Sequence, residues 1–242
     1  MTQSKVLILQ HVPWEKPGRI LDSLDDLGMS YEIANVAKEK KPDLPDFKEI
    51  SGVVIMGGPM GALDFDKYPG LKAEGKLARA AVSVGKPVLG VCLGHQIIAT
   101  ALGAKLKSGD APEIGFAPIK RIDKHDFFSM WNKTLDVLHW HNDVVTLPEG
   151  ATPLARSEKT KNQAFRFGSA LGLQFHLEVT PMLLDEWLDE PSMVKDLKAA
   201  GGSKSQLRDA FAEYNPQLQP MADQVFSGFA ARCSTYAATL ER

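Results

Sequence analysis

The stretch Pro87-Val-Leu-Gly-Val-Cys-Leu-Gly-His-Gln96 joins a short apolar run to a helical pattern through two closely spaced glycines. A fully apolar, β-branched run of this length is typical of a strand buried on both faces of a parallel sheet. The helical pattern continues over residues 93–102 and meets a glycine at 103, which is a common helix stop. The stretch therefore predicts a strand that turns directly into a helix, with Cys92 at the junction.

Strands and helices alternate on both sides of this stretch along the first half of the chain. Alternation at this spacing predicts an α/β fold with a mostly parallel central sheet and helices on both faces. The expected strands cover residues 6–9, 31–36, 52–56 and 87–91, and the expected helices cover residues 19–27, 71–84 and 93–102.

The second half of the chain has a different pattern. From about Ile114, short apolar segments between polar or Gly/Pro turns predict further strands, some of them antiparallel, at 116–122, 135–140, 154–157, 164–167 and 171–175. After Pro181 the periodicity is helical again, over 182–188, 193–199, 204–214 and 216–240. We therefore expect a domain over residues 1–190 and a C-terminal helical extension over 191–242 that packs on the same domain.

Composition excludes several classes of protein. The 242 residues are 44% hydrophobic and 24% charged, which is ordinary for a globular chain rather than a disordered one. The net charge of −2 disfavours a nucleic-acid-binding surface, and no apolar run approaches the ~20 residues of a membrane span. Cys92 and Cys233 cannot form a disulfide framework, so we expect a protein of the reducing cytoplasm.

Cys92 is the first candidate for chemistry. Glycines on both sides permit a tight turn from strand to helix that exposes the side chain at the carboxyl edge of the sheet. The partial positive charge of the helix N-terminus is expected to lower the thiol pKa and favour the thiolate nucleophile. A lone cysteine is more often a small buried hydrophobe, but the glycines and the junction favour the catalytic interpretation here.

A thiolate nucleophile needs a base, and Gln174-Phe-His-Leu-Glu178 offers one. On an extended segment His176 and Glu178 point to the same side, while Phe175 and Leu177 point into the core. Glu178 can then accept from one ring nitrogen of His176 and leave the other for the thiol. The alternative is a core histidine followed by a surface glutamate.

Gly57-Gly58-Pro59 follows another predicted strand at the same edge. Glycines there allow backbone N–H groups to point into a site, as an oxyanion hole requires, although a plain tight turn has the same sequence. The segment lacks the Lys-Ser/Thr ending of a phosphate loop.

Two further groups of polar residues lie near these motifs. His139-Trp-His141-Asn-Asp143 carries two histidines that could bind a metal ion, but no third ligand has an evident spacing. We therefore favour a polar loop at a strand end and predict no metal ion and no cofactor. Gln96 lies one helical turn after Cys92 and is expected to lie near it.

Together and in this order, the four motifs resemble those of the class I (triad) glutamine amidotransferases, with the glutaminase domain of GMP synthase the nearest likeness. The resemblance spans about residues 6–180 and implies a flavodoxin-like domain. It also implies that Cys92 attacks the side-chain amide of glutamine and forms a γ-glutamyl thioester, with His176 as base and then acid and Glu178 as its orienter. The residues that it implies around the substrate are Gly58 and Leu93, whose N–H groups form the oxyanion hole, and Gly57, Gln96, His141, Asn142 and Asp143, which bind the substrate.

The chain departs from the family pattern in two ways. Leu177 stands where the family most often has proline between the histidine and the glutamate. No sequence typical of an ATP-pyrophosphatase or other synthase domain accompanies the motifs, so the resemblance implies either a separate synthase subunit as partner or independent action. Three alternatives are open at this point: a glutaminase, a γ-glutamyl peptidase or hydrolase that acts on γ-glutamyl amides, and a catalytically silent scaffold.

Overall fold

The computed structural model describes residues 4–124 and 126–240. Within these residues the strands form a single nine-stranded sheet in the order β2-β1-β3-β4-β9-β8-β7-β5-β6. The strands are β1 (Lys5–Leu9), β2 (Tyr31–Ala34), β3 (Ile50–Ile55), β4 (Val88–Val91), β5 (Leu106–Arg121), β6 (Thr134–Val145), β7 (Thr152–Arg156), β8 (Ala164–Phe167) and β9 (Ala170–Leu173).

The sheet has a parallel half and an antiparallel half that share β9. The pairs from β2 through β1, β3 and β4 to β9 are all parallel. The pairs from β9 through β8, β7 and β5 to β6 are all antiparallel. The predicted α/β fold is confirmed, and the carboxyl ends of β3, β4 and β9 meet at one edge because these strands run the same way.

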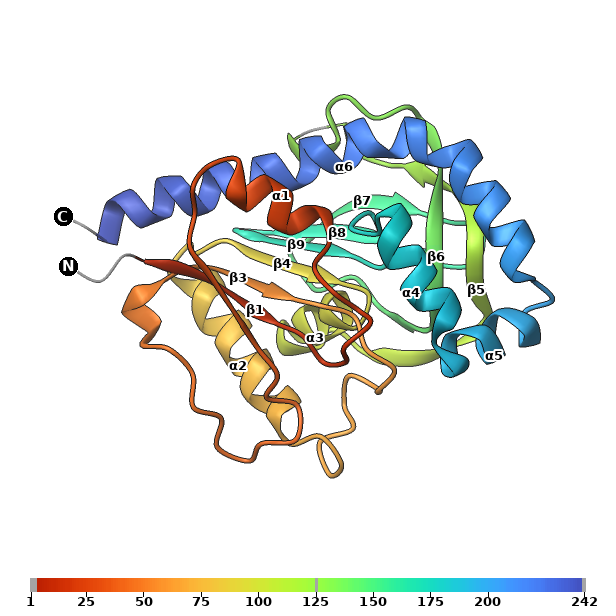
Figure 1. The fold of residues 1–242 in the computed structure, drawn as a ribbon. Helices are drawn as coiled ribbons and strands as arrows, with labels where there is room; N and C mark the ends of the chain where they lie inside the picture. Colours follow the sequence, from red (N-terminus) through yellow and green to blue (C-terminus); the bar gives the residue numbers. More distant parts are fainter. Residues whose placement is uncertain (1–3, 125, 241–242) are drawn as a thin grey trace.

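Helices cover both faces of the parallel half (Figure 1). Alternate residues of β1 explain this, because Val6 and Ile8 join one buried cluster while Leu7 and Leu9 join another. One face carries α1 and α6, and the other carries α2 and α3. The helices are α1 (Arg19–Asp25), α2 (Gly70–Ser83), α3 (Leu93–Ala101), α4 (Pro181–Asp189), α5 (Pro191–Ala199) and α6 (Lys204–Leu240), with short 3-10 turns η1 (Phe47–Glu49) and η2 (Asp126–Phe128).

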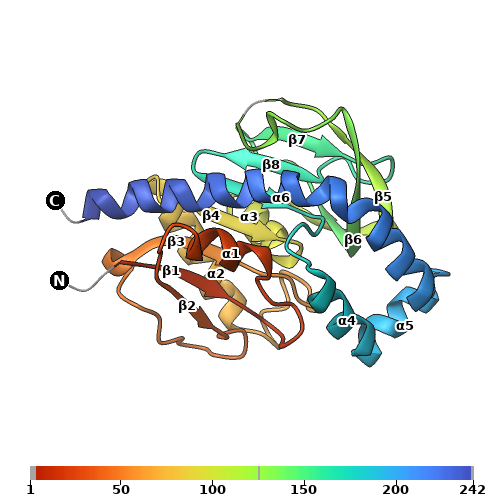
Figure 2. The ribbon, with the colours of Figure 1, turned by 45° about the horizontal axis from the view of Figure 1, so that its top comes forward.

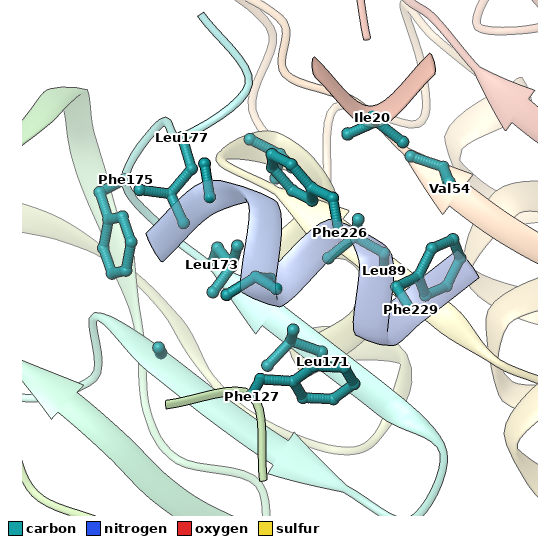
Figure 3. Close-up of a cluster of buried hydrophobic side chains, with 14 of the residues drawn as sticks. Ile20, Val54, Leu89, Phe127, Leu171, Leu173, Phe175, Leu177, Phe226 and Phe229 are labelled. Atoms are coloured by element: carbon teal, nitrogen blue, oxygen red, sulfur yellow. The ribbon is translucent and has the colours of Figure 1, made fainter. Parts of the chain in front are cut away.

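The C-terminal helix α6 belongs to the main core. Phe226 and Phe229 point from α6 into the cluster that also holds Val54, Leu89 and Leu171 of the central strands (Figure 3). Both phenylalanines are at most 1% exposed. Burying two such side chains contributes roughly 2 kcal/mol each, so α6 is held on the sheet by the hydrophobic effect. The boundary at residue 190 stays a prediction.

The separate helices predicted over 204–214 and 216–240 are one continuous helix, so that prediction was wrong. Pro216 and Pro220 lie inside α6, which changes direction along its course (Figures 1 and 2). Proline in a helix interior removes one hydrogen bond and bends the helix. Both prolines are exposed, and the buried residues Leu218 and Ala222 keep this part of α6 on the sheet.

Strands β5 and β6 are longer than the sequence indicated. The sequence predicted a strand only from residue 116, but Gly109, Pro112 and Gly115 lie within β5, which pairs with β6 over 106–108 and again over 113–120. The pairing register shifts between Ser108 and Glu113, so a bulge accommodates these residues. As a result, Ile114 beyond the bulge reaches the candidate site described below.

Candidate active site

The junction of β4 and α3 has the backbone expected of an exposed nucleophile. Cys92 has φ 52° and ψ −105°. It is the one non-glycine with a positive φ in the described ranges 4–124 and 126–240. Such a conformation is strained and persists only where surrounding contacts hold it. Here the Cys92 amide donates to the Leu173 carbonyl of β9 at 2.8 Å, which fixes the turn against the neighbouring strand.

The two glycines that flank Cys92 are required by close packing. A Cβ on Gly90 would lie 2.5 Å from the backbone of Gly94. A Cβ on Gly94 would lie 1.9 Å from the carbonyl oxygen of Ile55 on β3. Real Cβ atoms do not approach so closely, so α3 can leave the sheet at this angle only with glycine at both positions.

His176 and Glu178 form a buried pair on the segment that follows β9. The His176 amide donates to the Leu138 carbonyl of β6 at 2.8 Å, which fixes the segment. His176 Nδ1 lies 2.7 Å from Glu178 Oε1, and both side chains are 1% exposed. His176 Nε2 has no hydrogen-bond partner among the described residues. A carboxylate only accepts, so Nδ1 donates and Nε2 is left to act as a base.

The thiol and the imidazole are close enough to shift one another's pKa. Burial raises the pKa of the Cys92 thiol, and the nearby imidazole of His176 opposes this rise. Burial alone would lower the pKa of His176, but the charge of Glu178, the hydrogen bond to Glu178 and the nearby Cys92 thiol raise it well above 6.5. The expected lowering of the thiol pKa by the helix N-terminus is therefore outweighed by burial. In this state the thiol instead donates to the Trp140 carbonyl at 3.6 Å.

Gly58 and Leu93 lie side by side at the wall of the cavity above Cys92. A Cβ on Gly58 would lie 2.9 Å from Leu93 Cδ2. Neither backbone N–H donates a hydrogen bond within the part of the chain that the structure describes. Two unused donors beside a nucleophile are what an oxyanion hole requires.

The loop between β1 and α1 supports Gly57 and Gly58 from behind, which the sequence did not reveal. His11 Nδ1 lies 2.8 Å from the Gly57 carbonyl, and His11 Nε2 lies 2.9 Å from Glu74 Oε2 of α2. Both partners can only accept hydrogen bonds, so both ring nitrogens of His11 carry a proton. Burial opposes that charge, but Glu74 raises the pKa of His11 above its usual value.

Glu15, from the same loop, was also missed. Its side chain lies over the Cα of Gly57, because a Cβ on Gly57 would be 1.8 Å from Glu15 Oε2 and 3.6 Å from Cys92 Cβ. Glu15 is 7% exposed and lines the cavity. Burial raises its pKa to about 7, with His176 and His11 opposing the rise and Glu178 adding to it. A buried carboxyl group of perturbed pKa thus lies beside the nucleophile.

The structure brings most of the predicted substrate-binding residues to one side of the cavity. Gln96, His141, Asn142 and Asp143 all line it. Gln96 Nε2 donates to the Asp143 carbonyl at 3.0 Å, which joins α3 to β6. Gly57 instead lies beneath Glu15, and its carbonyl accepts from His11.

A third possible metal ligand lies beside the two histidines of β6. One ligand atom each from Glu113, His139 and His141 lies within 4.8 Å of the others, and Glu113 comes from the neighbouring strand β5. The expectation that no third ligand is near was therefore wrong. Glu113 Oε2 already accepts from Thr160 at 2.6 Å and Gln163 at 2.9 Å, as in a structural hydrogen-bond network. The absence of a bound metal stays a prediction.

The cavity above Cys92 has a volume of about 460 Å³, which lies in the range of small-molecule sites. Its far wall is formed by α4 and α5, with Trp187, Met193 and Asp196 among the lining residues. Trp187 is fully buried, and its Nε1 donates to the Trp14 carbonyl at 2.8 Å. Its ring packs edge-on against His176 with centroids 4.9 Å apart. The C-terminal helices therefore form part of the site.

Comparisons with known proteins identify a family to which the chain is similar. The model of the family "Glutamine amidotransferase class-I" matches residues 18–189. The glutamine amidotransferase-like protein YfeJ of Salmonella typhimurium is 33% identical over 73% of this chain and 76% of its own length. One subunit of the glutamine-hydrolyzing GMP synthase from Sulfolobus acidocaldarius is 33% identical over 66% of this chain and 82% of its own length.

A solved structure extends the likeness to the C-terminal helices. The crystal structure of a glutamine amidotransferase from Thermotoga maritima superposes with a TM-score of 0.86 at 31% identity. The match covers 95% of this chain and 99% of that one. None of the helices in the described part of the chain is both long and apolar enough to span a membrane.

Proposed function

The chain belongs to the class-I glutamine amidotransferase family, and we propose that it is a cysteine amidohydrolase that cleaves the side-chain amide of glutamine. The observation that carries this proposal is the arrangement at the cavity floor. A strained cysteine at a strand-to-helix turn lies beside a histidine whose other nitrogen is held by a glutamate.

The proposed reaction begins with transfer of the Cys92 proton to His176 Nε2 as sulfur attacks the amide carbonyl carbon. The N–H groups of Gly58 and Leu93 stabilise the oxyanion that forms. Imidazolium His176 then donates its proton to the leaving nitrogen, the C–N bond breaks, and ammonia departs from a γ-glutamyl thioester.

Water completes the cycle. His176 accepts a proton from water as it attacks the thioester, the C–S bond breaks, and the proton returns to the thiolate, which yields glutamate and free enzyme. Throughout, Glu178 holds the His176 ring in one tautomer and stabilises its charged form.

A second candidate function is hydrolysis of larger γ-glutamyl amides. The observation that favours it is the wall formed by α4 and α5 of this chain, which extends the cavity beyond the nucleophile. The same wall favours independent activity over activity that requires a separate synthase subunit. The relative from Sulfolobus is named as one subunit of an enzyme, so we keep a synthase partner as the competing proposal.

Active-site labelling and product release test the proposal. A diazo-ketone analogue of glutamine should label Cys92 in the purified protein, and glutamate should be released from glutamine without any added synthase. Cys233 is the matched control, since it is fully buried and burial raises its pKa, and the Cys233→Ala protein should be labelled as the wild type is. Labelling of Cys233 in place of Cys92 would overturn the assignment of the nucleophile. Glutaminase activity that appears only after a synthase is added would overturn the proposal that the protein acts independently.

A further inference from the structure

Acidic side chains outnumber basic ones in the lining of the cavity. Its ionisable lining includes the carboxylates of Glu15, Asp143 and Asp196 but no lysine or arginine among the described residues. The chain as a whole has 28 basic and 30 acidic residues, so this imbalance does not follow from composition. His141 also lines the cavity, with its Nε2 3.4 Å from Glu113 Oε2.

These carboxylates lie on two sides of the nucleophile. Asp143 is next to Gln96, on the side formed by α3 and β6, where the family resemblance places the residues that bind the substrate. Glu15 and Asp196 come from the β1–α1 loop and from α5. Trp187 links these elements to the base, because it contacts both Trp14 and His176. His176 gives its proton to the leaving nitrogen, so this second side receives the leaving group.

The second side combines carboxylates with aromatic rings. Trp14, Trp140 and Trp187 line the cavity, and the rings of Trp140 and Trp187 meet edge-to-face with centroids 5.6 Å apart. Indole faces and carboxylates both attract an ammonium group. A peptide leaving group would bring a carboxylate into the same space without any described cation to pair with it.

We infer that this site prefers γ-glutamyl amides whose leaving amine carries a second, positively charged amino group over those whose leaving amine carries a carboxylate. The inference rests on the proposed function and narrows its second candidate. Asp196 is exposed at the cavity mouth, so its carboxylate can attract the far amino group along its path, and Glu15 beside the reacting atoms adds to this attraction once it is ionised.

Three amides of similar length test the preference. They are the γ-glutamyl monoamide of 1,4-diaminobutane, the neutral γ-glutamyl n-pentylamide and the acidic γ-glutamyl-4-aminobutyrate. At low salt, we expect kcat/KM for the cationic amide to be about tenfold higher than kcat/KM for the neutral amide. We expect it to be about a hundredfold higher than kcat/KM for the acidic amide. The preference should shrink as ionic strength rises.

Charge variants assign the preference to this side of the cavity. Asp196→Asn should lower the ratio of kcat/KM for the cationic amide to kcat/KM for the neutral amide severalfold. Asp196→Lys should make the acidic amide the preferred substrate. Asp209→Asn is the matched control, because Asp209 is exposed on α6 and does not line the cavity. An unchanged ratio in both Asp196 variants would overturn the assignment.

Binding separates this inference from the proposed function. The Cys92→Ala protein, checked for an unchanged melting temperature, is titrated calorimetrically with the same three amides. One outcome is that the wild type hydrolyses neither glutamine nor any of the three amides, but the cationic amide binds most tightly. The proposed function would then fail and the charge preference would stand. If glutamine is hydrolysed but the neutral or acidic amide is preferred in turnover and in binding, the charge preference fails alone.

Discussion

The two walls of the cavity are built in different ways. The sheet-edge wall consists of Cys92, Leu93 and Gly58, which follow the carboxyl ends of parallel strands β4 and β3. The helical wall consists of Trp187, Met193 and Asp196 on α4 and α5. In the first wall, the chain packs so closely around its glycines that a Cβ atom would not fit there. In the second wall, the packing of buried side chains holds the helices in place. The comparison suggests that the first wall determines the reaction and the second determines which leaving group is accepted.

The largest effect is expected at the nucleophile of the sheet-edge wall. Cys92→Ala removes the attacking atom and little volume, so hydrolysis of every amide should fall at least about 10⁴-fold while the fold is kept. Steady-state release of glutamate measures this, and thermal unfolding checks the fold. The control is Cys233→Ala, which removes a buried thiol outside the cavity. A Cys92→Ala protein that retains a few per cent of activity would mean that the first wall does not determine the reaction.

The sequence predicted the sheet-edge wall and its base because their constraints are local. Gly90, Cys92 and Gly94 lie within five residues, and His176 and Glu178 are two apart, so spacing indicated these groups, and the family resemblance added Leu93. Strands β1, β3, β4 and β9 of the parallel half were predicted for the same reason, since each is a short and mainly apolar run. Strand β8 was predicted with its observed bounds.

The helical wall could not be predicted because its contacts join distant segments. Trp187 Nε1 donates to a carbonyl 173 residues earlier, and no local periodicity indicates such a contact. The position of Glu15 likewise depends on the missing side chain of Gly57. The signal available was weak: a tryptophan and a glutamate next to each other after the first strand, in a loop at the edge where Cys92 was expected.

The second prediction asks whether the sheet-edge wall needs the charged orienter of its base. Glu178→Gln keeps the shape of the side chain but removes the charge that opposes the effect of burial on His176. The His176 pKa should fall, seen by imidazole NMR, and kcat should drop about 10²- to 10³-fold for all amides alike. Glu186→Gln is the control, because Glu186 is a partly exposed residue of α4 that pairs with Lys16 at 2.6 Å. A loss confined to large amides would contradict the division between the walls.

The third prediction concerns Glu15, which lies where the two walls meet. The folded protein keeps the Glu15 proton up to about pH 7, whereas the unfolded chain releases it near 4.5. The folded state thus binds more protons in this window, so stability should fall as the pH rises through it. Relative to Glu15→Gln, the wild type should lose up to about 3 kcal/mol of unfolding free energy between pH 4.5 and 7.5.

Denaturant unfolding across this pH range measures the difference for Glu15. Glu39→Gln, at an exposed position, should follow the pH dependence of the wild type. Parallel curves for wild type and Glu15→Gln would show that the Glu15 carboxyl is not held in its neutral form beside Cys92.

The smallest effect is expected in the helical wall. Trp187→Phe leaves the Trp14 carbonyl without its 2.8 Å donor and opens space beside α5. An unpaired buried carbonyl and a partly filled site cost about 1 to 3 kcal/mol, which the fold can absorb. Because the loss falls on the leaving-group side, kcat/KM for a large γ-glutamyl amide should decrease about tenfold more than kcat/KM for glutamine.

Trp131→Phe is the matched control for the helical wall. Trp131 is also buried and stacks on Phe128 with centroids 4.0 Å apart, but it does not line the cavity. Removing its indole should lower the melting temperature and leave the ratio of kcat/KM for the large amide to kcat/KM for glutamine unchanged. If Trp187→Phe reduced turnover of glutamine as much as that of the large amide, the wall would act through the His176 ring that it packs against. The leaving group would then be selected elsewhere, since a wall that acts only by holding the base cannot distinguish amides that share the same γ-glutamyl group.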